Sequence, residues 1–486
     1  MNYQSTRGFE GTVTASEAIL KGLAPDGGLY IPMEIPNYDI NNDAFLTNSY
    51  QELALEIMGP LLSDFTREEL QECIEKAYDD KFDDTLIAPV KKVGTDYYLE
   101  LFHGPTLAFK DMALSILPYL MTTAQKKQTI ENEIIILTAT SGDTGKAAME
   151  GFADVPGTKI IVFYPKNGVS AIQEKQMLTQ TGANTFVVGI HGNFDDAQKK
   201  VKELFSREDL KERLLENKQQ FSSANSINIG RLVPQIVYYF YGYQQLVKQG
   251  EITLGEKINV SVPTGNFGNI LAGYFAKQMG LPINVFICAS NKNNVLTDFF
   301  NTGTYNRNRD FHVTNSPSMD ILVSSNLERL MYYVTGKDTK RLSQLMTDLS
   351  QVGTYNVTEA EKERMNDFFA GFATEEEVVQ VVKQVLEVDK YVADPHTAVA
   401  KKVVNDYLDA TKDSHKTLIV STASPYKFPQ VITGAVPVEE EVATLHEMTQ
   451  LPIPTPIIDL EKATLRKEIV VDLDQMESTV LDILGV

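Results

Sequence analysis

The sequence predicts an α/β protein with two open parallel-sheet domains, a helical N-terminal domain and a helical insertion. From Tyr97 onwards, short apolar runs alternate with helical patterns, which is typical of parallel sheets covered by helices on both faces. The number of runs suggests two such sheets rather than one. Helical spacing prevails before residue 90 and again between residues 291 and 390.

The expected strands are short apolar runs that alternate with helices. These runs are residues 134–137, 160–164, 185–190, 258–262, 285–288 and 417–420. The helical patterns between them begin near Gly145, Ser170, Phe194, Gly230, Phe267 and Thr397. Further helical spacing covers residues 50–58 and 67–78 in the N-terminal part, and residues 325–334, 339–349, 358–372 and 375–388 in the insertion.

These patterns divide the chain into four parts. Residues 1–90 form the mainly helical N-terminal domain, and residues 97–225 form a smaller α/β domain. Residues 226–290 and 391–486 together form a larger α/β domain, which residues 291–390 interrupt as a helical insertion. At 486 residues the chain is long enough for several domains and a large apolar core.

The charge balance limits the classes of partner. Lys and Arg number 44 against 65 Asp and Glu, which gives a formal net charge of −21 at pH 7. So acidic a surface repels phosphate backbones and anionic lipids, and we expect neither nucleic acid nor membrane as a partner. An anionic small substrate is still compatible with this charge, because a local cationic pocket can oppose the overall field.

Targeting and cysteine patterns favour a cytoplasmic protein. The first residues contain no apolar core of a secretion signal, and no apolar run is long enough to span a bilayer. Cys73 and Cys288 are far apart in apolar contexts, which favours buried thiols over a disulfide or a zinc site. The six histidines show no i, i+4 pairing, so we expect no metal site.

Residues 102–111 contain the candidate catalytic lysine. Lys110 follows Leu107, Ala108 and Phe109, at the point where an apolar loop gives way to a helical pattern. A dry environment favours the neutral amine, which can condense with an aldehyde. A lysine whose stem snorkels at the start of a helix would show the same pattern.

Two glycine-rich loops are candidate anion sites. Residues 138–146 follow an expected strand and open a helix with Ser141, Asp143 and Thr144, which are also good capping residues. Residues 263–269, Pro-Thr-Gly-Asn-Phe-Gly-Asn, repeat this arrangement after the expected strand at 258–262. Gly265 and Gly268 allow the backbone to approach an oxyanion closely. A lysine that can form an imine and a phosphate cup are the two features that pyridoxal phosphate needs.

Two further segments carry polar groups with two interpretations each. Residues 225–231, Asn-Ser-Ile-Asn-Ile-Gly-Arg, place Arg231 at a helix start, where it binds a phosphate or carboxylate or is simply exposed. Residues 421–429 follow an expected strand, and a hydroxyl there bonds a ring nitrogen or caps a turn.

Taken together, these segments resemble the threonine synthases, pyridoxal-phosphate enzymes of the tryptophan-synthase-β fold group (fold type II). The resemblance covers nearly the whole chain and rests on ordered motifs at residues 23–30, 103–111, 140–145, 225–228, 265–269, 316–329 and 394–398. It implies a cytoplasmic lyase that converts O-phospho-L-homoserine and water to L-threonine and phosphate, the last step of threonine biosynthesis. The reaction is a γ-elimination followed by β-addition of water, and the protein is a monomer or homodimer.

The resemblance also implies roles for individual residues. Lys110 is the catalytic residue, which bonds the cofactor as a Schiff base and then moves protons. The cofactor-binding residues are Lys110, Asp143, Gly265, Asn266, Phe267, Gly268, Asn269 and Thr422. The substrate-binding residues are Ser141, Thr144, Asn225 and Arg231. Asp143 lies near the phenolic oxygen of the cofactor, and Thr422 meets its pyridine nitrogen.

The chain departs from the family pattern near its C-terminal strand. The family commonly has Thr-Ala-His-Pro-Ala-Lys-Phe, whereas residues 422–428 read Thr-Ala-Ser-Pro-Tyr-Lys-Phe, with Ser424 for histidine and Tyr426 for a small residue. Three other interpretations are weighed against threonine synthase. They are another enzyme of fold type II, such as a serine or threonine dehydratase or a β-replacing synthase, a silent ligand-binding paralogue, and a nucleotide-binding doubly wound protein.

Overall fold

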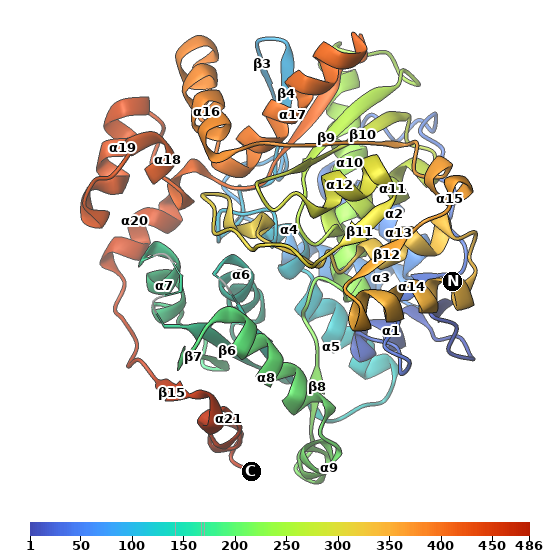
Figure 1. Ribbon diagram of the computed structural model, residues 1–486. Helices are drawn as coiled ribbons and strands as arrows, with labels where there is room; N and C mark the ends of the chain where they lie inside the picture. Colours follow the sequence, from blue (N-terminus) through green and yellow to red (C-terminus); the bar gives the residue numbers. More distant parts are fainter. Residues whose placement is uncertain (141, 167, 170) are drawn as a thin grey trace.

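The larger sheet occupies the upper half of the molecule in Figure 1. The structure, a computed structural model, describes residues 1–140, 142–166, 168–169 and 171–486, and within these the larger sheet has six strands in the order β13-β10-β9-β14-β4-β3. The strands are β13 (Phe368–Phe372), β10 (Ile283–Ser290), β9 (Ile258–Pro263), β14 (Thr417–Ser421), β4 (Asp96–Glu100) and β3 (Val90–Val93). Only β3 is antiparallel to its neighbour.

Both faces of this sheet are buried, because successive side chains of its strands alternate between two cores. In β14, Leu418 and Val420 pack in the core of α10 (Ile229–Lys248) and α11 (Gly268–Gln278). Ile419 packs in a separate core with α16 (Glu375–Asp389) and α17 (Pro395–Thr411). The continuous apolar run at 417–420 therefore forms a central strand, as the sequence predicts.

The smaller sheet lies below the larger one in Figure 1. In the described part of the chain it has five parallel strands in the order β15-β7-β6-β5-β8. These are β15 (Val470–Asp472), β7 (Thr185–His191), β6 (Thr158–Pro165), β5 (Glu133–Ala139) and β8 (Gln219–Ser222). Its helices are α6 (Asp143–Phe152), α7 (Ala171–Leu178), α8 (Phe194–Ser206), α9 (Glu208–Glu216) and α21 (Met476–Leu484). The expectation of two parallel sheets is confirmed.

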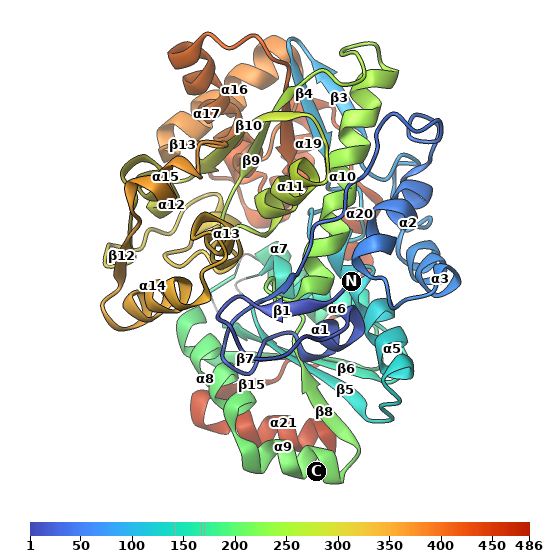
Figure 2. The ribbon, with the colours of Figure 1, turned by 90° about the vertical axis from the view of Figure 1, so that its right-hand side faces the viewer.

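The N-terminal part packs on the long helix α10 (Figure 2). It contains the antiparallel pair β1 (Tyr3–Ser5) and β2 (Tyr30–Pro32) and the helices α1 (Ala15–Lys21), α2 (Tyr50–Leu61) and α3 (Arg67–Ala77). The N-cap residue before each of these helices is a Ser or Thr, and a Glu follows three residues later. The two side chains form a capping box, in which each accepts a hydrogen bond from the backbone N–H of the other residue. The ring of Tyr50 in α2 lies 5.2 Å from that of Tyr241 in α10.

The remaining helices connect these parts. The segment that carries Lys110 continues into α4 (Asp111–Leu114) and α5 (Leu117–Lys127). The insertion contains α12 (Val295–Thr302), α13 (Leu327–Val334), α14 (Thr339–Gln351) and α15 (Glu359–Glu363), with a hairpin of β11 (Thr304–Asn306) and β12 (Thr354–Asn356). The C-terminal segment contains α18 (Gln430–Thr433), α19 (Glu441–Thr449) and α20 (Thr455–Lys462), and 3-10 turns lie at Pro317–Met319, Pro425–Lys427, Val438–Glu440 and Leu473–Gln475.

The prediction of a single helix over residues 358–372 is wrong. The helix α15 ends at Glu363, and β13 follows as the edge strand of the larger sheet, parallel to β10. Its sequence, Phe-Phe-Ala-Gly-Phe, is rich in β-favouring aromatic residues. Phe368 packs against Phe286 of β10 and Phe300 of α12, with ring centroids 5.4 and 5.1 Å apart, so tertiary packing determines the strand.

Strand pairing differs from the expected domain division at two further places. The strand β4 lies at the start of the expected smaller domain, residues 97–225. It pairs with β14, so the β3–β4 hairpin belongs to the larger sheet. The last strand, β15, pairs with β7 of the smaller sheet, although residues 391–486 were assigned to the larger domain. The C-terminal segment thus passes from the larger sheet down one side of the molecule to the smaller one (Figure 1).

Cys73 and Cys288 are free and buried, as expected. Among the described residues, no helix combines the length and the apolar composition that crossing a membrane requires.

Candidate active site

The loop that carries Lys110 is fixed to the end of β14. The N–H of Phe109 donates to the carbonyl of Thr422 (2.8 Å), and the N–H of Ser424 donates to the carbonyl of Leu107 (3.0 Å). Lys110 directly precedes α4, whose first residue, Asp111, accepts hydrogen bonds from the backbone N–H and hydroxyl of Thr106 at 2.8 and 2.6 Å. Residues 106–111 are therefore held from both sides, and the position of the lysine is determined by backbone contacts.

The amine of Lys110 lies in a largely dry environment. Burial lowers its pKa to about 8, and the positive charges of Lys427 and Arg231 lower it further, against the opposing charge of Asp143. Its Nζ lies 3.5 Å from the hydroxyl of Ser318, a weak hydrogen bond. A substantial neutral fraction near pH 8 makes this amine nucleophilic, which is what the apolar neighbours of Lys110 in the sequence predict.

A buried ion pair lies beside this amine. Lys427 donates to Oδ1 of Asp143 and to the carbonyl of Thr106, both at 2.8 Å, and its side chain is fully buried. Asp143 also accepts from Gln173 at 3.1 Å and from the hydroxyl of Ser318 at 3.5 Å. Burial raises the pKa of Asp143, but the charges of Lys427 and Lys110 outweigh it and hold this pKa well below its usual value. Asp143 is therefore a carboxylate.

The loop at 263–269 connects β9 to α11 and is closely packed. Phe267 is buried in a left-handed conformation (φ 67°), and α11 begins at Gly268. A Cβ added to Gly265 would lie 2.7 Å from the carbonyl oxygen of Ser318, too close for any side chain. A Cβ added to Gly268 would meet nothing nearer than 3.5 Å, the amide nitrogen of Asn326. Close backbone approach therefore requires glycine at 265 but not at 268.

The segment at 316–329 joins this loop to residues 225–228. Ser324 donates to the carbonyl of Gly265 at 2.7 Å, and the N–H of Asn326 donates to the carbonyl of Asn266 at 2.9 Å. The amide of Asn326 reaches the carbonyl of Ser226 at 3.1 Å. Arg329, which is fully buried, donates to the carbonyls of Tyr30 (2.9 Å) and Ile227 (2.6 Å). The two loops and the N-terminal part are thus held in one hydrogen-bonded unit.

Ser318 is itself held by a histidine. Its N–H donates to Nε2 of His396 at 3.2 Å, so that nitrogen is unprotonated and the ring proton sits on Nδ1, 2.7 Å from Asp394. Asp394 also accepts from the N–H of Thr397, as the N-cap of α17.

Arg231 is a buried cation with no carboxylate partner in the described part of the chain. It lies in the first turn of α10, and its Nη1 donates to the carbonyl of Ala224 at 3.1 Å. Its Nε has no hydrogen-bond partner among the described residues, and burial lowers its pKa to about 10. An unpaired guanidinium in a buried position is unfavourable on its own, and it is suited to an anionic ligand.

The other predicted residues take varied positions. Asn269 closes its loop by donating to the carbonyl of Pro263 at 3.0 Å, whereas Asn266 and Asn225 are exposed. Thr144 is half-buried in the first turn of α6, and Thr422 is buried directly after β14. Ser141 lies outside the described residues.

The sequence comparisons identify the family. Residues 2–78 match the family described as "Threonine synthase N terminus", and residues 85–423 match "Pyridoxal-phosphate dependent enzyme". Threonine synthase of Schizosaccharomyces pombe is 36% identical over 468 residues, which cover 90% of this chain and 89% of that protein. The chain belongs to the threonine synthase family of pyridoxal-phosphate-dependent enzymes.

Solved structures of threonine synthases agree with this assignment. The crystal structure of the yeast enzyme superposes with a TM-score of 0.88 at 31% identity, covering 100% of this chain and 99% of that one. The pyridoxal-phosphate-bound enzyme from Brucella melitensis gives 0.88 at 34% identity with the same coverage. Human threonine synthase-like 1 is 40% identical over 438 residues, and this chain spans only 58% of its length. The expected fold type II is confirmed.

The site has the groups that the cofactor of a threonine synthase requires. Lys110 is an amine with a lowered pKa. The 263–269 loop leads into α11 and contains Gly265, where a Cβ would clash with the carbonyl of Ser318. The Nε–H of Arg231 has no partner among the described residues. These observations fit pyridoxal phosphate and an anionic substrate.

The departures from the threonine synthase family pattern are structurally accommodated. The hydroxyl of Ser424 accepts from the N–H of Tyr426 at 3.3 Å and so caps the 3-10 turn that positions Lys427. The ring of Tyr426 is fully buried, and its hydroxyl donates to the carbonyl of Leu451 at 2.5 Å.

Three contributing residues were not singled out from the sequence: Lys427, Ser318 and His396. Lys427 shares one feature with Lys110, because it too lies in a turn-rich loop beside apolar residues. Ser318 and His396 lie inside recognised motifs, but only the folded structure places their side chains.

Proposed function

We propose that the protein is a threonine synthase, which converts O-phospho-L-homoserine and water to L-threonine and phosphate. One juxtaposition supports this proposal most strongly: a half-buried amine with a lowered pKa lies close enough to Arg231, a buried guanidinium with no carboxylate partner among the described residues, to respond to its charge. The amine suits an aldehyde cofactor and the guanidinium suits a phosphate or carboxylate. The relatives named above support the same reaction.

We assign the cofactor contacts to four groups of residues. Lys110 would hold pyridoxal phosphate through its amine, and the backbone of residues 265–269 would hold the phosphate at the start of α11. Asp143, charge-balanced by Lys427, would lie near the phenolic oxygen, and Thr422 would face the ring nitrogen. When bound, the cofactor supplies an electron-withdrawing ring that stabilises negative charge on the substrate carbon next to its imine.

Lys110 then acts on protons. An amine with a pKa of about 8 is present in both protonation states near neutral pH, which suits general acid–base catalysis. In this proposal it removes the proton at Cα and serves the protons at Cβ and Cγ, because one flexible amine reaches three neighbouring carbons. The hydroxyl of Ser318 lies within 3.5 Å of both Nζ of Lys110 and a carboxylate oxygen of Asp143, so it orients the amine between these steps.

Arg231, Asn225, Thr144 and Ser141 are the proposed substrate contacts. Arg231 would bind the phosphate or carboxylate through its guanidinium, whose buried Nε–H has no other partner among the described residues. A site built to hydrogen-bond a phosphate strongly rejects analogues that lack it. Serine and threonine are therefore expected to be poor substrates.

One assay tests the proposal. Purified protein loaded with pyridoxal phosphate is incubated with O-phospho-L-homoserine, and L-threonine and inorganic phosphate are both measured over time. We expect the two products in equal amounts, and none from a Lys110→Ala variant. Release of an oxoacid from threonine or serine, with no threonine from phosphohomoserine, would instead indicate a dehydratase of the same fold.

We also propose a cytoplasmic location. Two buried free cysteines are typical of proteins from reducing compartments.

A further inference from the structure

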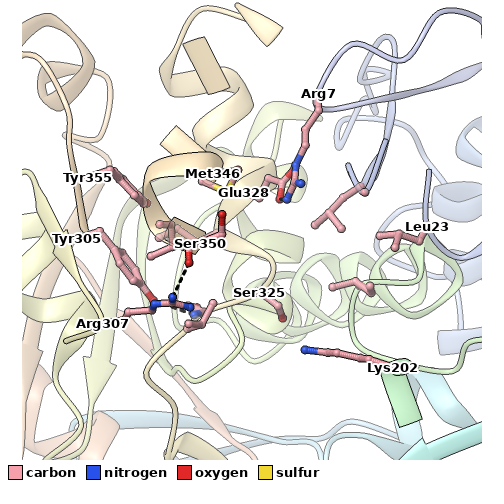
Figure 3. Close-up of a pocket in the computed structure, with 17 residues that line it drawn as sticks. Arg7, Leu23, Lys202, Tyr305, Arg307, Ser325, Glu328, Met346, Ser350 and Tyr355 are labelled. Atoms are coloured by element: carbon pink, nitrogen blue, oxygen red, sulfur yellow. Dashed lines mark hydrogen bonds and ion pairs between the residues drawn. The ribbon is translucent and has the colours of Figure 1, made fainter. Parts of the chain in front are cut away.

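A cavity lies beside the two loops at residues 225–228 and 263–269. It has a volume of about 380 Å³ and is lined by the N-terminal part, α8 and the insertion (Figure 3). Ile227 and Ser325 form part of its wall. The hydroxyl of Ser325 lies 3.4 Å from Oδ1 of Asn266 and 3.5 Å from the hydroxyl of Ser226. The cavity therefore adjoins both loops to which we assign the phosphate groups of cofactor and substrate.

The charges that line this cavity do not cancel. Three cations, Arg7, Lys202 and Arg307, face one carboxylate, Glu328. Glu328 is already paired with Arg7, whose Nε and Nη2 donate to it at 2.9 and 2.8 Å. Lys202 and Arg307 have no ion pair with any described residue. Two uncompensated cations at one cavity contrast with the net charge of −21 for the chain.

The free cations point into a shared space. Figure 3 shows the amine end of Lys202, from α8, turned toward Ser325 and the guanidinium of Arg307. The guanidinium uses Nη2 to bond the carbonyl of Ser350 at 2.8 Å, which fixes its orientation and leaves further N–H groups free. A hydroxyl, a guanidinium and an ammonium around one space match the oxygen atoms of a phosphate.

Part of the cavity wall is apolar. Leu29, Met346 and Leu349 contribute to it. A ligand with an anionic end and a short carbon chain thus meets polar and apolar groups in one cavity, as in small-molecule sites generally.

We propose that this cavity is a phosphate-binding antechamber of the active site, in which Lys202 and Arg307 hold the phosphate of the incoming substrate and of the departing product. The role rests on the proposed function, because phosphohomoserine carries a phosphate that an acidic surface repels. A local cationic site raises the concentration of such an anion and its rate of association. Ser325 connects the antechamber to the loops of the inner site.

The first experiment measures the salt dependence of kcat/KM for O-phospho-L-homoserine. In the Lys202→Gln/Arg307→Gln protein we expect a loss of about fivefold to tenfold at low ionic strength, which disappears at high salt because screening removes the steering. The matched control is Lys211→Gln, which removes one surface charge from α9, outside the cavity, and keeps the parental salt dependence. Equal kcat/KM in parent and double variant at low salt would overturn the proposal.

The second experiment measures binding of inorganic phosphate directly. Calorimetry is carried out on cofactor-loaded protein with Arg231→Gln, which removes the inner phosphate contact. We expect this protein to retain one phosphate site, which the added Lys202→Gln/Arg307→Gln substitutions weaken at least about tenfold. Arg307→Lys keeps the charge but loses the planar set of donors, so we expect it to weaken the site less than Arg307→Gln does. Unchanged phosphate binding after both substitutions would contradict the antechamber. This readout needs no turnover, so failure of the proposed reaction is distinguished from failure of the antechamber.

Discussion

Lys427 and Asp143 form a fully buried ion pair that joins the two sheets at the candidate active site. Nζ of Lys427, in the turn after β14 of the larger sheet, lies 2.8 Å from Oδ1 of Asp143, the first residue of α6 on the smaller sheet. The same amine donates to the carbonyl of Thr106, four residues before Lys110. A single side chain thus connects both sheets and the lysine loop.

Removing one partner of this pair should strongly destabilise the fold. We expect Lys427→Met to lower the free energy of unfolding by about 3–5 kcal/mol, because it leaves the Asp143 carboxylate buried and unpaired. The double variant Lys427→Met/Asp143→Asn should regain a large part of that loss. Urea unfolding of the parent, both single variants and the double variant measures the coupling. A single variant as stable as the parent would mean that the pair is solvated in solution.

The rate of cofactor loading should depend on pH with a midpoint near 8. Burial lowers the pKa of Lys110 to about 8, so its reactive neutral form grows between pH 7 and 9 instead of near 10.5. Replacing Lys427 by Met removes a neighbouring positive charge and should move the midpoint to higher pH. Absorbance changes on adding pyridoxal phosphate to the apoprotein give the rate at each pH. A rate that stays flat from pH 7 to 9 would show that the amine is more solvated than the structure indicates.

The two glycines of the phosphate loop should respond differently to alanine. Gly265→Ala places a methyl group 2.7 Å from the carbonyl of Ser318, so the loop or the Ser318 segment must move. We expect its cofactor affinity to fall about tenfold or more, since forced repacking of this kind costs at least about 1.4 kcal/mol. Gly268→Ala is the comparison within the same loop, because its methyl group makes only ordinary contacts with the protein, and we expect it to lose less affinity than Gly265→Ala. Equilibrium dialysis measures the cofactor affinity of both variants. Equal losses of affinity would contradict the claim that close backbone contact at Gly265 shapes the loop.

Arg231 should affect the substrate far more than the cofactor. We expect Arg231→Leu to lower kcat/KM for phosphohomoserine about a hundredfold or more, because a lost charged partner costs about 2–5 kcal/mol. Folding should tolerate the change, since it replaces an unpaired buried cation by an apolar group. Cofactor affinity is the internal control and should change less than about threefold. Equal damage to both quantities would place Arg231 at the cofactor instead.

The sequence predicted the elements that local pattern determines. The mainly apolar runs at 134–137, 258–262 and 417–420 became central strands, because both faces of these strands are buried. The helices α2 and α3 were predicted from their helical spacing, which is also a local pattern.

Elements that depend on distant partners were missed. The strand β13 resembles the end of a helix until Phe286 and Phe300 are in place, and β15 is only three residues long and needs β7 beside it. The site also has a part that the local sequence predicts and a part that it does not. The apolar neighbours of Lys110 predicted its environment. The roles of Lys427 and Ser318 depend on contacts with Asp143 and Lys110, which are 284 and 208 residues away in the sequence.

The most direct test asks which lysine bonds the cofactor. Protein loaded with pyridoxal phosphate is reduced with borohydride, digested, and the peptide that carries the phosphopyridoxyl group is identified by mass spectrometry. We expect the label on Lys110 alone, and no stable label in Lys110→Ala. A label on Lys427, the fully buried lysine beside Asp143, or on any other lysine would contradict the account.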